Sequence, residues 1–164
     1  MNRVARIVTC LFTVFASASV AAAQDRVGGH FGAVIPLVSR AGGSTSTIAD
    51  QVEIGFPTGI SVKTPTDWAF DLELVPSVTR ARSVSLTVHP GIIRKLPNSF
   101  GAGARMAFDV RGSAWGFTPL VNRGFPVGAL TYFVEAVAPV RFKQVGAGVN
   151  QTSIGFGMHF GVAF

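Results

Sequence analysis

The chain has 164 residues, a length that fits one domain, and it carries a formal net charge of +6. Hydrophobic residues make up 48% of the chain and charged residues only 13%, well below the roughly 25% charged residues of soluble domains. This composition excludes an ordinary water-facing surface. The basic residues form no run interleaved with aromatic residues, so we expect no nucleic-acid partner.

Residues 1–23 are predicted to be a cleavable signal peptide, and residues 24–164 the mature domain. Arg3 and Arg6 supply a positively charged start, "IVTCLFTVFASASV" supplies a short apolar core, and "AAA" matches the small-residue cleavage site. An uncleaved anchoring helix is the alternative, but the apolar stretch is short for a membrane span. Cys10, the only cysteine, lies within this segment, so we expect a mature domain without disulfides.

Period-two alternation of apolar and polar side chains runs through the mature domain and predicts β-strands. Eight strands are expected, at residues 29–38, 51–63, 68–79, 83–93, 99–111, 115–122, 130–143 and 152–164. Most of them have the roughly 9–11 residues of a tilted membrane-spanning strand. The connections, among them "NRGFPVGA", are rich in turn-forming residues, and "SRAGGSTSTIAD" is predicted to be a long loop after the first strand.

Each predicted strand presents one bulky apolar face and one small or polar face. In the third strand, for example, Phe70, Leu72 and Leu74 alternate with Asp71 and Glu73. An eight-stranded barrel has an interior just wide enough for side chains, so we expect the bulky face outside, against lipid.

The polar faces together predict a charge network in the lumen of the barrel. Its members are Glu53, Lys63, Asp71, Glu73, His89, Arg105, Asp109, Arg111, Glu135, Arg141, Lys143 and His159. The five acids match the five Lys and Arg residues, as a narrow interior requires, because a buried unpaired charge is costly. Tight turns set approximate registers, which place His89 near Asp71 or Glu73 and near Arg105, and Glu135 near His159.

A soluble barrel with an apolar interior alternates in the same way and is the main alternative fold. Aromatic residues near the strand ends favour the membrane form, since aromatic girdles mark both interfaces. These residues are Trp68, Phe100, Trp115, Tyr132 and Phe142. Backbone groups in lipid need hydrogen-bond partners, so the last strand must pair with the first. We therefore expect an all-β fold, an eight-stranded antiparallel up-and-down transmembrane β-barrel with both termini periplasmic.

The eight alternating segments and the terminal "GMHFGVAF" resemble the small eight-stranded outer-membrane β-barrel proteins, of the OmpX and OmpA transmembrane-domain type. The resemblance covers the whole mature domain. It implies an outer-membrane location, contact with outer-membrane lipids and lipopolysaccharide, and insertion by the barrel-assembly machinery. In that family a final aromatic residue after alternating apolar residues is the assembly signal, which here falls on Phe160, Val162 and Phe164.

A hydrolytic site is the catalytic alternative, built from Ser85 or Thr87 with His89 and Glu73. Nucleophilic catalysis needs the base within hydrogen-bond reach of the hydroxyl, whereas Ser85 and His89 lie about 13 Å apart along one strand. A lipid A hydrolase or acyltransferase would need its histidine on the lipid face, and no histidine falls on the apolar strips. We therefore expect no catalytic residues.

His30, His89 and His159 lie on separate predicted strands without a metal-ligand spacing, so we expect neither a metal nor a cofactor. Eight strands filled with side chains leave no open channel. We expect a monomer with a closed, charge-paired lumen and a structural or lipopolysaccharide-interacting role in the envelope. A minor transport barrel for small or hydrophobic molecules is the first alternative, and a lipid A-modifying barrel enzyme is the second.

Overall fold

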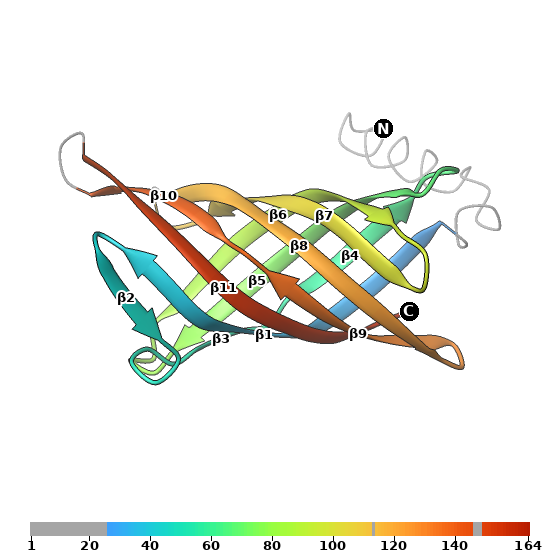
Figure 1. The fold of residues 1–164 in the computed structure, drawn as a ribbon, viewed down its shortest axis with the longest axis horizontal. Coiled ribbons are helices and arrows are strands. Elements are labelled where there is room, and N and C mark those ends of the chain that lie inside the picture. The colour runs from blue at the N-terminus through green and yellow to red at the C-terminus, as the bar shows by residue number, and fades with distance from the viewer. Residues whose placement is uncertain (1–25, 113, 146–148) are drawn as a thin grey trace, which may run out of the picture.

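The chain forms the strands of one antiparallel sheet, described by a computed structural model over residues 26–112, 114–145 and 149–164 (Figure 1). The strands are β1 (Val27–Ala41), β2 (Ser44–Thr47), β3 (Glu53–Gly55), β4 (Thr58–Lys63), β5 (Trp68–Thr79), β6 (Val84–Lys95), β7 (Phe100–Asp109), β8 (Ala114–Val127), β9 (Leu130–Val137), β10 (Val140–Val145) and β11 (Val149–Ala163). Within the described ranges, no helix has the length and apolar character of a membrane span. The predicted signal peptide lies outside these ranges.

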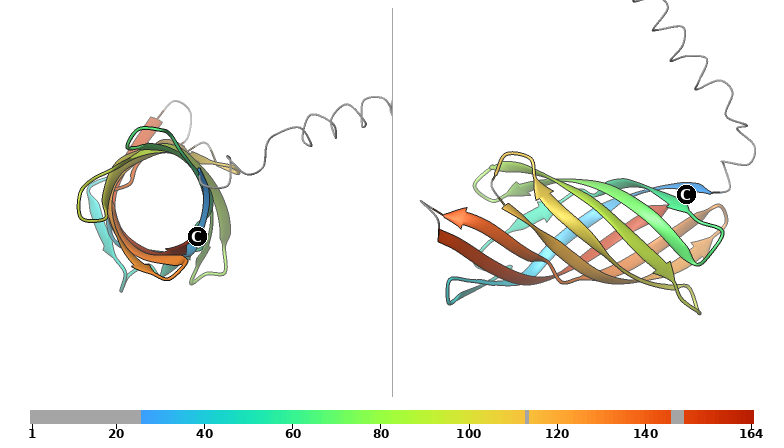
Figure 2. Two further views of the ribbon diagram at one scale, coloured as in Figure 1. Left: turned by 90° about the vertical axis from the view of Figure 1, so that its right-hand side faces the viewer. Right: turned by 90° about the horizontal axis from the view of Figure 1, so that it is seen from above.

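The sheet closes on itself as a ring of eight strand positions (Figure 2). Strands β3 and β4 together fill the second position, and β9 and β10 the seventh, so each position neighbours the next along the chain. Strand β11 pairs antiparallel with β1, from the His30–Ala163 pair to the Ala41–Ser153 pair, and this pairing closes the ring. The predicted antiparallel ring of eight strands is confirmed.

Two of the strand positions are interrupted at prolines. Pro57 separates β3 from β4, and Pro139 separates β9 from β10. Proline has no N–H to donate to a sheet, but both proline carbonyls still accept hydrogen bonds from neighbouring strands, from Gly32 at 2.9 Å and from Gly155 at 2.8 Å. The second and seventh predicted strands are therefore broken locally while the ring stays closed.

The predicted long loop after the first strand is instead a β-hairpin. Strand β1 continues to Ala41, and β2 pairs back on it with Val38 opposite Thr47. Gly42 and Gly43 form the turn with φ values of 56° and 83°, which a two-residue hairpin turn needs and glycine adopts easily. The loop prediction was wrong because it relied on Gly, Ser and Thr content, although alternating Ser and Thr also pair well in strands.

Strand β8 extends beyond its predicted end. It reaches Val127, so most of "NRGFPVGA" is strand, and only two residues connect it to β9. Arg123, Phe125 and Val127 continue the alternation of the strand, with Val127 paired to Leu130. The Gly and Pro of this segment indicated a connection, but they are tolerated within the strand, and the turn begins at Gly128, with φ of 61°.

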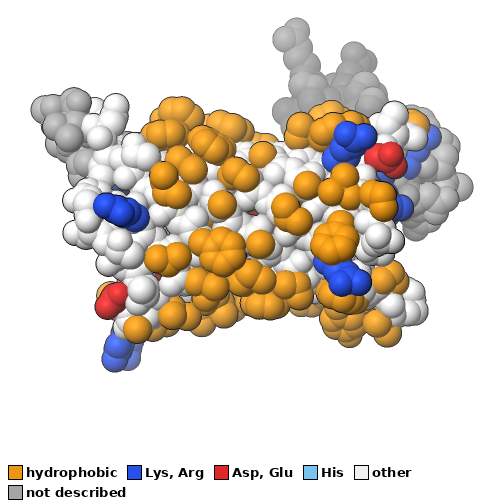
Figure 3. Space-filling view, viewed as in Figure 1, with side chains coloured by type: hydrophobic (Ala, Val, Ile, Leu, Met, Phe, Trp, Pro, Cys, Tyr) orange, Lys and Arg blue, Asp and Glu red, His pale blue; other side chains and the backbone are white. Residues whose placement is uncertain are grey.

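Side chains alternate between the outside and the inside of the ring, as predicted. Bulky apolar side chains face outward at every strand position and cover the surface between the two ends, whereas the charged side chains of that view gather toward the ends (Figure 3). One example from each position in turn is Phe31, Ile60, Leu72, Ile92, Met106, Phe117, Tyr132 and Phe160. Among the described residues, the buried apolar side chains are Pro57, Val75, Ala107, Leu120 and Val137. The apolar interior is therefore small.

The ring has two ends, which we name the terminal end and the loop end (Figure 1). Strand β1 begins and β11 finishes at the terminal end, where β4 joins β5, β6 joins β7 and β8 joins β9. The β1–β2 hairpin lies at the loop end, where β5 joins β6, β7 joins β8 and β10 joins β11.

Candidate functional site

A layer of buried charged side chains lies across the interior of the ring, with Arg105 of β7 at its centre. Arg105 is 4% exposed. Its Nε donates to Asp71 Oδ2 at 2.6 Å, and its Nη1 donates to Glu135 Oε1 at 2.7 Å. Its Nη2 lies 3.5 Å from Glu73 Oε2. One guanidinium therefore holds carboxylates from β5 and β9 through charge-assisted hydrogen bonds, which are stronger than neutral ones.

Two histidines flank the carboxylates of β5. His30 of β1 places Nε2 3.1 Å from Glu73 Oε2 and Nδ1 3.9 Å from Asp71 Oδ1. His89 of β6 places Nδ1 3.5 Å from Glu73 Oε1. Both histidines are buried, with 7% and 8% exposure. Glu73 therefore lies between these two imidazoles and the Arg105 guanidinium, and His159 Nδ1 lies 3.9 Å from its Oε2.

The third histidine, His159 of β11, completes the layer on the side of β9. Its Nδ1 lies 3.1 Å from Glu135 Oε1, and Asn122 of β8 donates to Glu135 Oε2 at 3.2 Å. Phe133 packs edge-on against the His159 ring at a centroid distance of 4.9 Å, and against His30 at 6.2 Å. An aromatic side chain therefore covers the layer on the side of the terminal end.

Glycines on the inner face make room for the largest members of the layer. Gly59 of β4 lies between His30 and Glu73 in register, and a Cβ there would approach His30 Cε1 to 2.5 Å. Gly91 of β6 pairs with Arg105, and a Cβ there would approach Arg105 Cγ to 2.6 Å. The His30 imidazole and the Arg105 side-chain stem therefore occupy space that any residue with a Cβ would fill.

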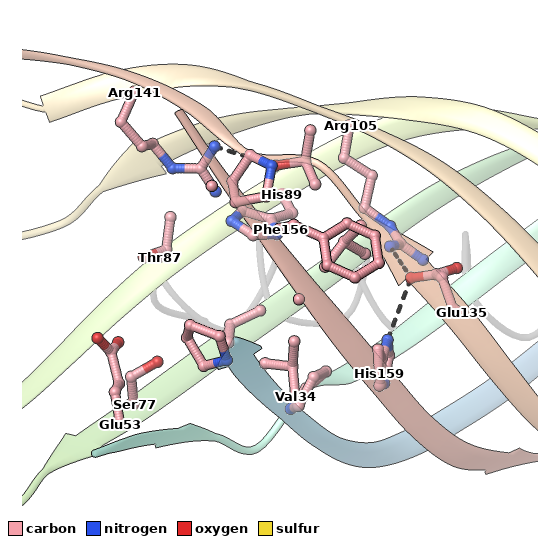
Figure 4. A pocket seen from close by; sticks show the side chains of 18 of the residues that line it. Val34, Glu53, Ser77, Thr87, His89, Arg105, Glu135, Arg141, Phe156 and His159 are labelled. Carbon is pink, nitrogen blue, oxygen red and sulfur yellow. Dashed lines mark hydrogen bonds and ion pairs between the residues drawn. The ribbon is translucent and has the colours of Figure 1, made fainter. Parts of the chain in front are cut away.

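A cavity of about 250 Å³ lies between the layer and the loop end. Arg105, Glu135 and His159 meet at one side of it, and Glu53 and Arg141 lie toward the other (Figure 4). Arg141 donates to Thr118 Oγ1 at 3.0 Å and to two backbone carbonyls, of Phe117 and Val140. The interior is therefore filled by the layer and Phe133 toward the terminal end and is hollow toward the loop end.

Six of the twelve predicted network residues meet in the layer: Asp71, Glu73, His89, Arg105, Glu135 and His159. The expected pairs Glu73–His89 and Glu135–His159 are directly opposed in register. Arg105 is opposed by Gly91 rather than by His89, although Arg105 and His89 both line the cavity.

The other six predicted residues lie away from the layer. Glu53 and Arg141 line the cavity, whereas Lys63, Asp109, Arg111 and Lys143 lie at or near strand ends. The expected pairing of five acids with five bases does not form, because charges near strand ends can reach water. Among the described residues, the buried layer instead holds three carboxylates and one guanidinium, accompanied by three imidazoles.

Residues outside the predicted network also belong to the site. His30, Asn122 and Phe133 contact the layer, and Ser61 donates to Asp71 Oδ1 at 2.6 Å. The alternation already places His30 on the inner face of the first strand. Its approach to Glu73 depends on the register of β1, β4 and β5 and on the missing side chain of Gly59.

The residues of the predicted assembly signal lie at the terminal end of β11. Phe160 and Phe164 are exposed, with 45% and 64% exposure, and Val162 is half-buried. Val162 pairs with Phe31 on one side and with Tyr132 on the other. The three side chains therefore continue the outer apolar surface to the last residue.

The geometry of the layer favours ion pairing between buried side chains over activation of a serine or threonine hydroxyl by His89. The Nδ1 of His89 faces Glu73, and among the described residues its Nε2 has no hydrogen-bond partner. Ser85 opposes Ser77 and Thr87 opposes Val75 on β5, so neither hydroxyl is paired with His89 in register.

Comparison of the chain with protein-family models, with curated proteins and with solved structures finds no match.

Proposed function

We propose that this protein is an outer-membrane β-barrel with a closed lumen and a structural or lipopolysaccharide-interacting role in the envelope. The observation that carries the proposal is the orientation of the two faces, with bulky apolar side chains outside and a charged layer inside. A soluble barrel has the opposite arrangement. Apolar surface left in water costs about 25 cal/mol per Å², and surrounding lipid removes that cost.

Side chains at the terminal end support this placement. The Arg123 guanidinium carbon lies 5.2 Å from the ring centroid of Phe100 and 5.3 Å from that of Phe125, and Arg94 lies 5.7 Å from Trp68. Aromatic residues concentrate at membrane interfaces, and long basic side chains there extend toward the headgroups. The guanidinium groups of these exposed arginines therefore lie against aromatic rings at a position where they can also meet lipid phosphates.

The loop end offers a second interfacial surface. Trp115 and Phe142 stack with a centroid distance of 4.8 Å, and Arg80 and Arg82 are exposed in the β5–β6 connection. In the proposed orientation both termini are periplasmic, and the loop end faces the leaflet that contains lipopolysaccharide. The two arginines would then pair with its phosphate groups. Phe160, Val162 and Phe164 would be the segment that the barrel-assembly machinery reads.

The deciding experiment for membrane insertion is expression of the full chain in a Gram-negative host, followed by membrane fractionation and gel electrophoresis. We expect the protein in the outer-membrane fraction, released only by detergent. We also expect its gel migration to change after boiling, because a closed barrel resists unfolding in detergent. Recovery in a soluble fraction without detergent would contradict the proposal.

The closed lumen separates this function from the transport alternative. The layer around Arg105 and the ring of Phe133 lie between the cavity and the terminal end, and eight strands leave no wider path. We expect no discrete conductance steps when the purified barrel is added to a planar lipid bilayer. Steady openings would favour transport, and a mass change of lipid A on expression would favour the lipid A-modifying enzyme.

A further inference from the structure

We propose that His30, Asp71 and Glu73 form a binding site for one divalent first-row transition-metal ion, with Zn²⁺ as its probe. The site lies inside the ring, and its existence does not depend on where the protein resides. It goes beyond the proposed envelope role and beyond the sequence expectation of no metal. That expectation rested on sequence spacing, which does not show that the register of β1, β4 and β5 brings His30 to Glu73.

The three side chains lie close together, as a set of metal ligands must. All three are buried, and one ligand atom from each lies within 4.8 Å of the others. His30 Nε2 and Glu73 Oε2 are 3.1 Å apart, a separation that ligands on one metal can have at bond lengths of about 2.0–2.2 Å. Gly59 makes this possible, because its missing side chain lets the imidazole of β1 reach β5 across β4.

The charge of the layer favours a divalent cation. Asp71, Glu73 and Glu135 face a single guanidinium, Arg105, so the layer has an excess of two negative charges when its imidazoles are neutral. Buried uncompensated charge is costly, and one divalent ion would cancel it. Glu53 and Arg141, farther along the cavity, have opposite charges and leave this balance unchanged.

Neighbouring groups orient the proposed ligands in the way that metal sites require. Asp71 accepts from Ser61 on one oxygen and from Arg105 on the other, both at 2.6 Å, and each carboxylate oxygen keeps a second lone pair. Hydrogen bonds of this kind fix the orientation of a ligating carboxylate and contribute to metal affinity.

His89 lies beside the proposed ligands. It is 8% exposed, its Nδ1 lies 3.5 Å from Glu73, and among the described residues its Nε2 makes no hydrogen bond. Of the three proposed ligands, Glu73 also lines the cavity on the loop-end side of the layer, as does His89.

The donor types indicate which ions would bind. One imidazole with two carboxylates suits Zn²⁺ and its first-row neighbours. Ca²⁺ takes six to eight oxygen ligands, more than these side chains supply, so we expect it to bind far more weakly.

The test is titration of tag-free, chelator-stripped barrel, refolded in detergent, with ZnCl₂ in a calorimeter. Wild type should bind one equivalent of Zn²⁺, and His30→Gln should weaken binding at least tenfold. His159→Gln is the comparison variant, because the His159 imidazole bonds to Glu135 and lies 3.9 Å from Glu73, farther than the 3.1 Å of His30. This variant should therefore weaken Zn²⁺ binding less than His30→Gln does. The chain has three histidines, His30, His89 and His159, so no other residue can supply an imidazole ligand.

Several outcomes would overturn the site. They are the absence of saturable binding to wild type, equal weakening in both variants, and unchanged binding in His30→Gln. If His30→Gln does not refold, X-ray absorption at the zinc edge of loaded wild type decides. Coordination by imidazole nitrogen together with oxygen would support the site, and coordination by oxygen alone would contradict it.

Discussion

Phe164 and Gly29 exchange two backbone hydrogen bonds at the terminal end of the ring. Gly29 N–H donates to the Phe164 carbonyl at 2.9 Å, and Phe164 N–H donates to the Gly29 carbonyl at 3.0 Å. The Phe164 ring lies over Gly29 so closely that a Cβ there would be 2.6 Å from its Cε2. The last residue therefore contributes to closing the barrel, in addition to any part that it plays in assembly.

The first prediction concerns this closure. Deleting Phe164 removes both hydrogen bonds, each worth about 0.5–1.5 kcal/mol, so the free energy of unfolding should fall by about 1–3 kcal/mol. Phe164→Leu keeps the backbone and is the control for the side chain. Urea titration of the refolded barrel, followed by tryptophan fluorescence, measures both variants. A deletion that leaves stability unchanged would show that the Gly29 pair contributes nothing.

The second prediction concerns the buried layer. Arg105→Met removes the guanidinium that Asp71, Glu73 and Glu135 share, and leaves these buried carboxylates without their arginine partner. Removing one partner of a buried ion pair costs about 3–5 kcal/mol of stability. Arg123→Met, at an exposed position, should change stability far less. Urea titration measures the free energy of unfolding of both variants. A similar loss of unfolding free energy in the two variants would argue against a stabilising layer.

The fold and part of the site were accessible from the sequence because they depend on local regularities. Alternation predicts the eight strand positions and their two faces, and tight turns predict the pairs Glu73–His89 and Glu135–His159. The approach of His30 to Glu73 was not accessible, because it joins β1 to β5 across a third strand.

Composition was a poorer guide than alternation wherever the two disagreed. Gly42 and Gly43 lie in a hairpin turn rather than in a long loop, and the strand β8 runs through a Gly- and Pro-containing segment to Val127. Counting charges on one face also overstated the network. Lys63 and Lys143, for example, lie on the predicted inner face but at strand ends, where they are exposed.

The third prediction is a pH effect at the loop end. Asp50 accepts hydrogen bonds from the backbone N–H and the hydroxyl of Thr47, both at 2.8 Å, and these bonds hold the pKa of Asp50 below its usual value. Stabilisation by a carboxylate with a lowered pKa is present above the usual pKa and is lost as the pH falls through the lowered one. The protection factor of the Thr47 amide against hydrogen exchange should therefore fall only at acidic pH, and in Asp50→Asn it should not depend on pH in this way. Fast exchange in wild type at neutral pH would contradict the prediction.

The fourth prediction separates a membrane barrel from a soluble one. Leu72 lies near the middle of β5 on the outer face, 42% exposed, and Val84 begins β6 at the loop end, 62% exposed. In lipid vesicles, Leu72→Arg should cost about 2–4 kcal/mol of folding free energy and Val84→Arg only about 0–1 kcal/mol, because the cost of arginine falls from the bilayer midplane to the interface. In a protein surrounded by water, each substitution should change the folding free energy by no more than about 0.5 kcal/mol. Equal, small effects at the two depths would show that the apolar outer surface does not face lipid.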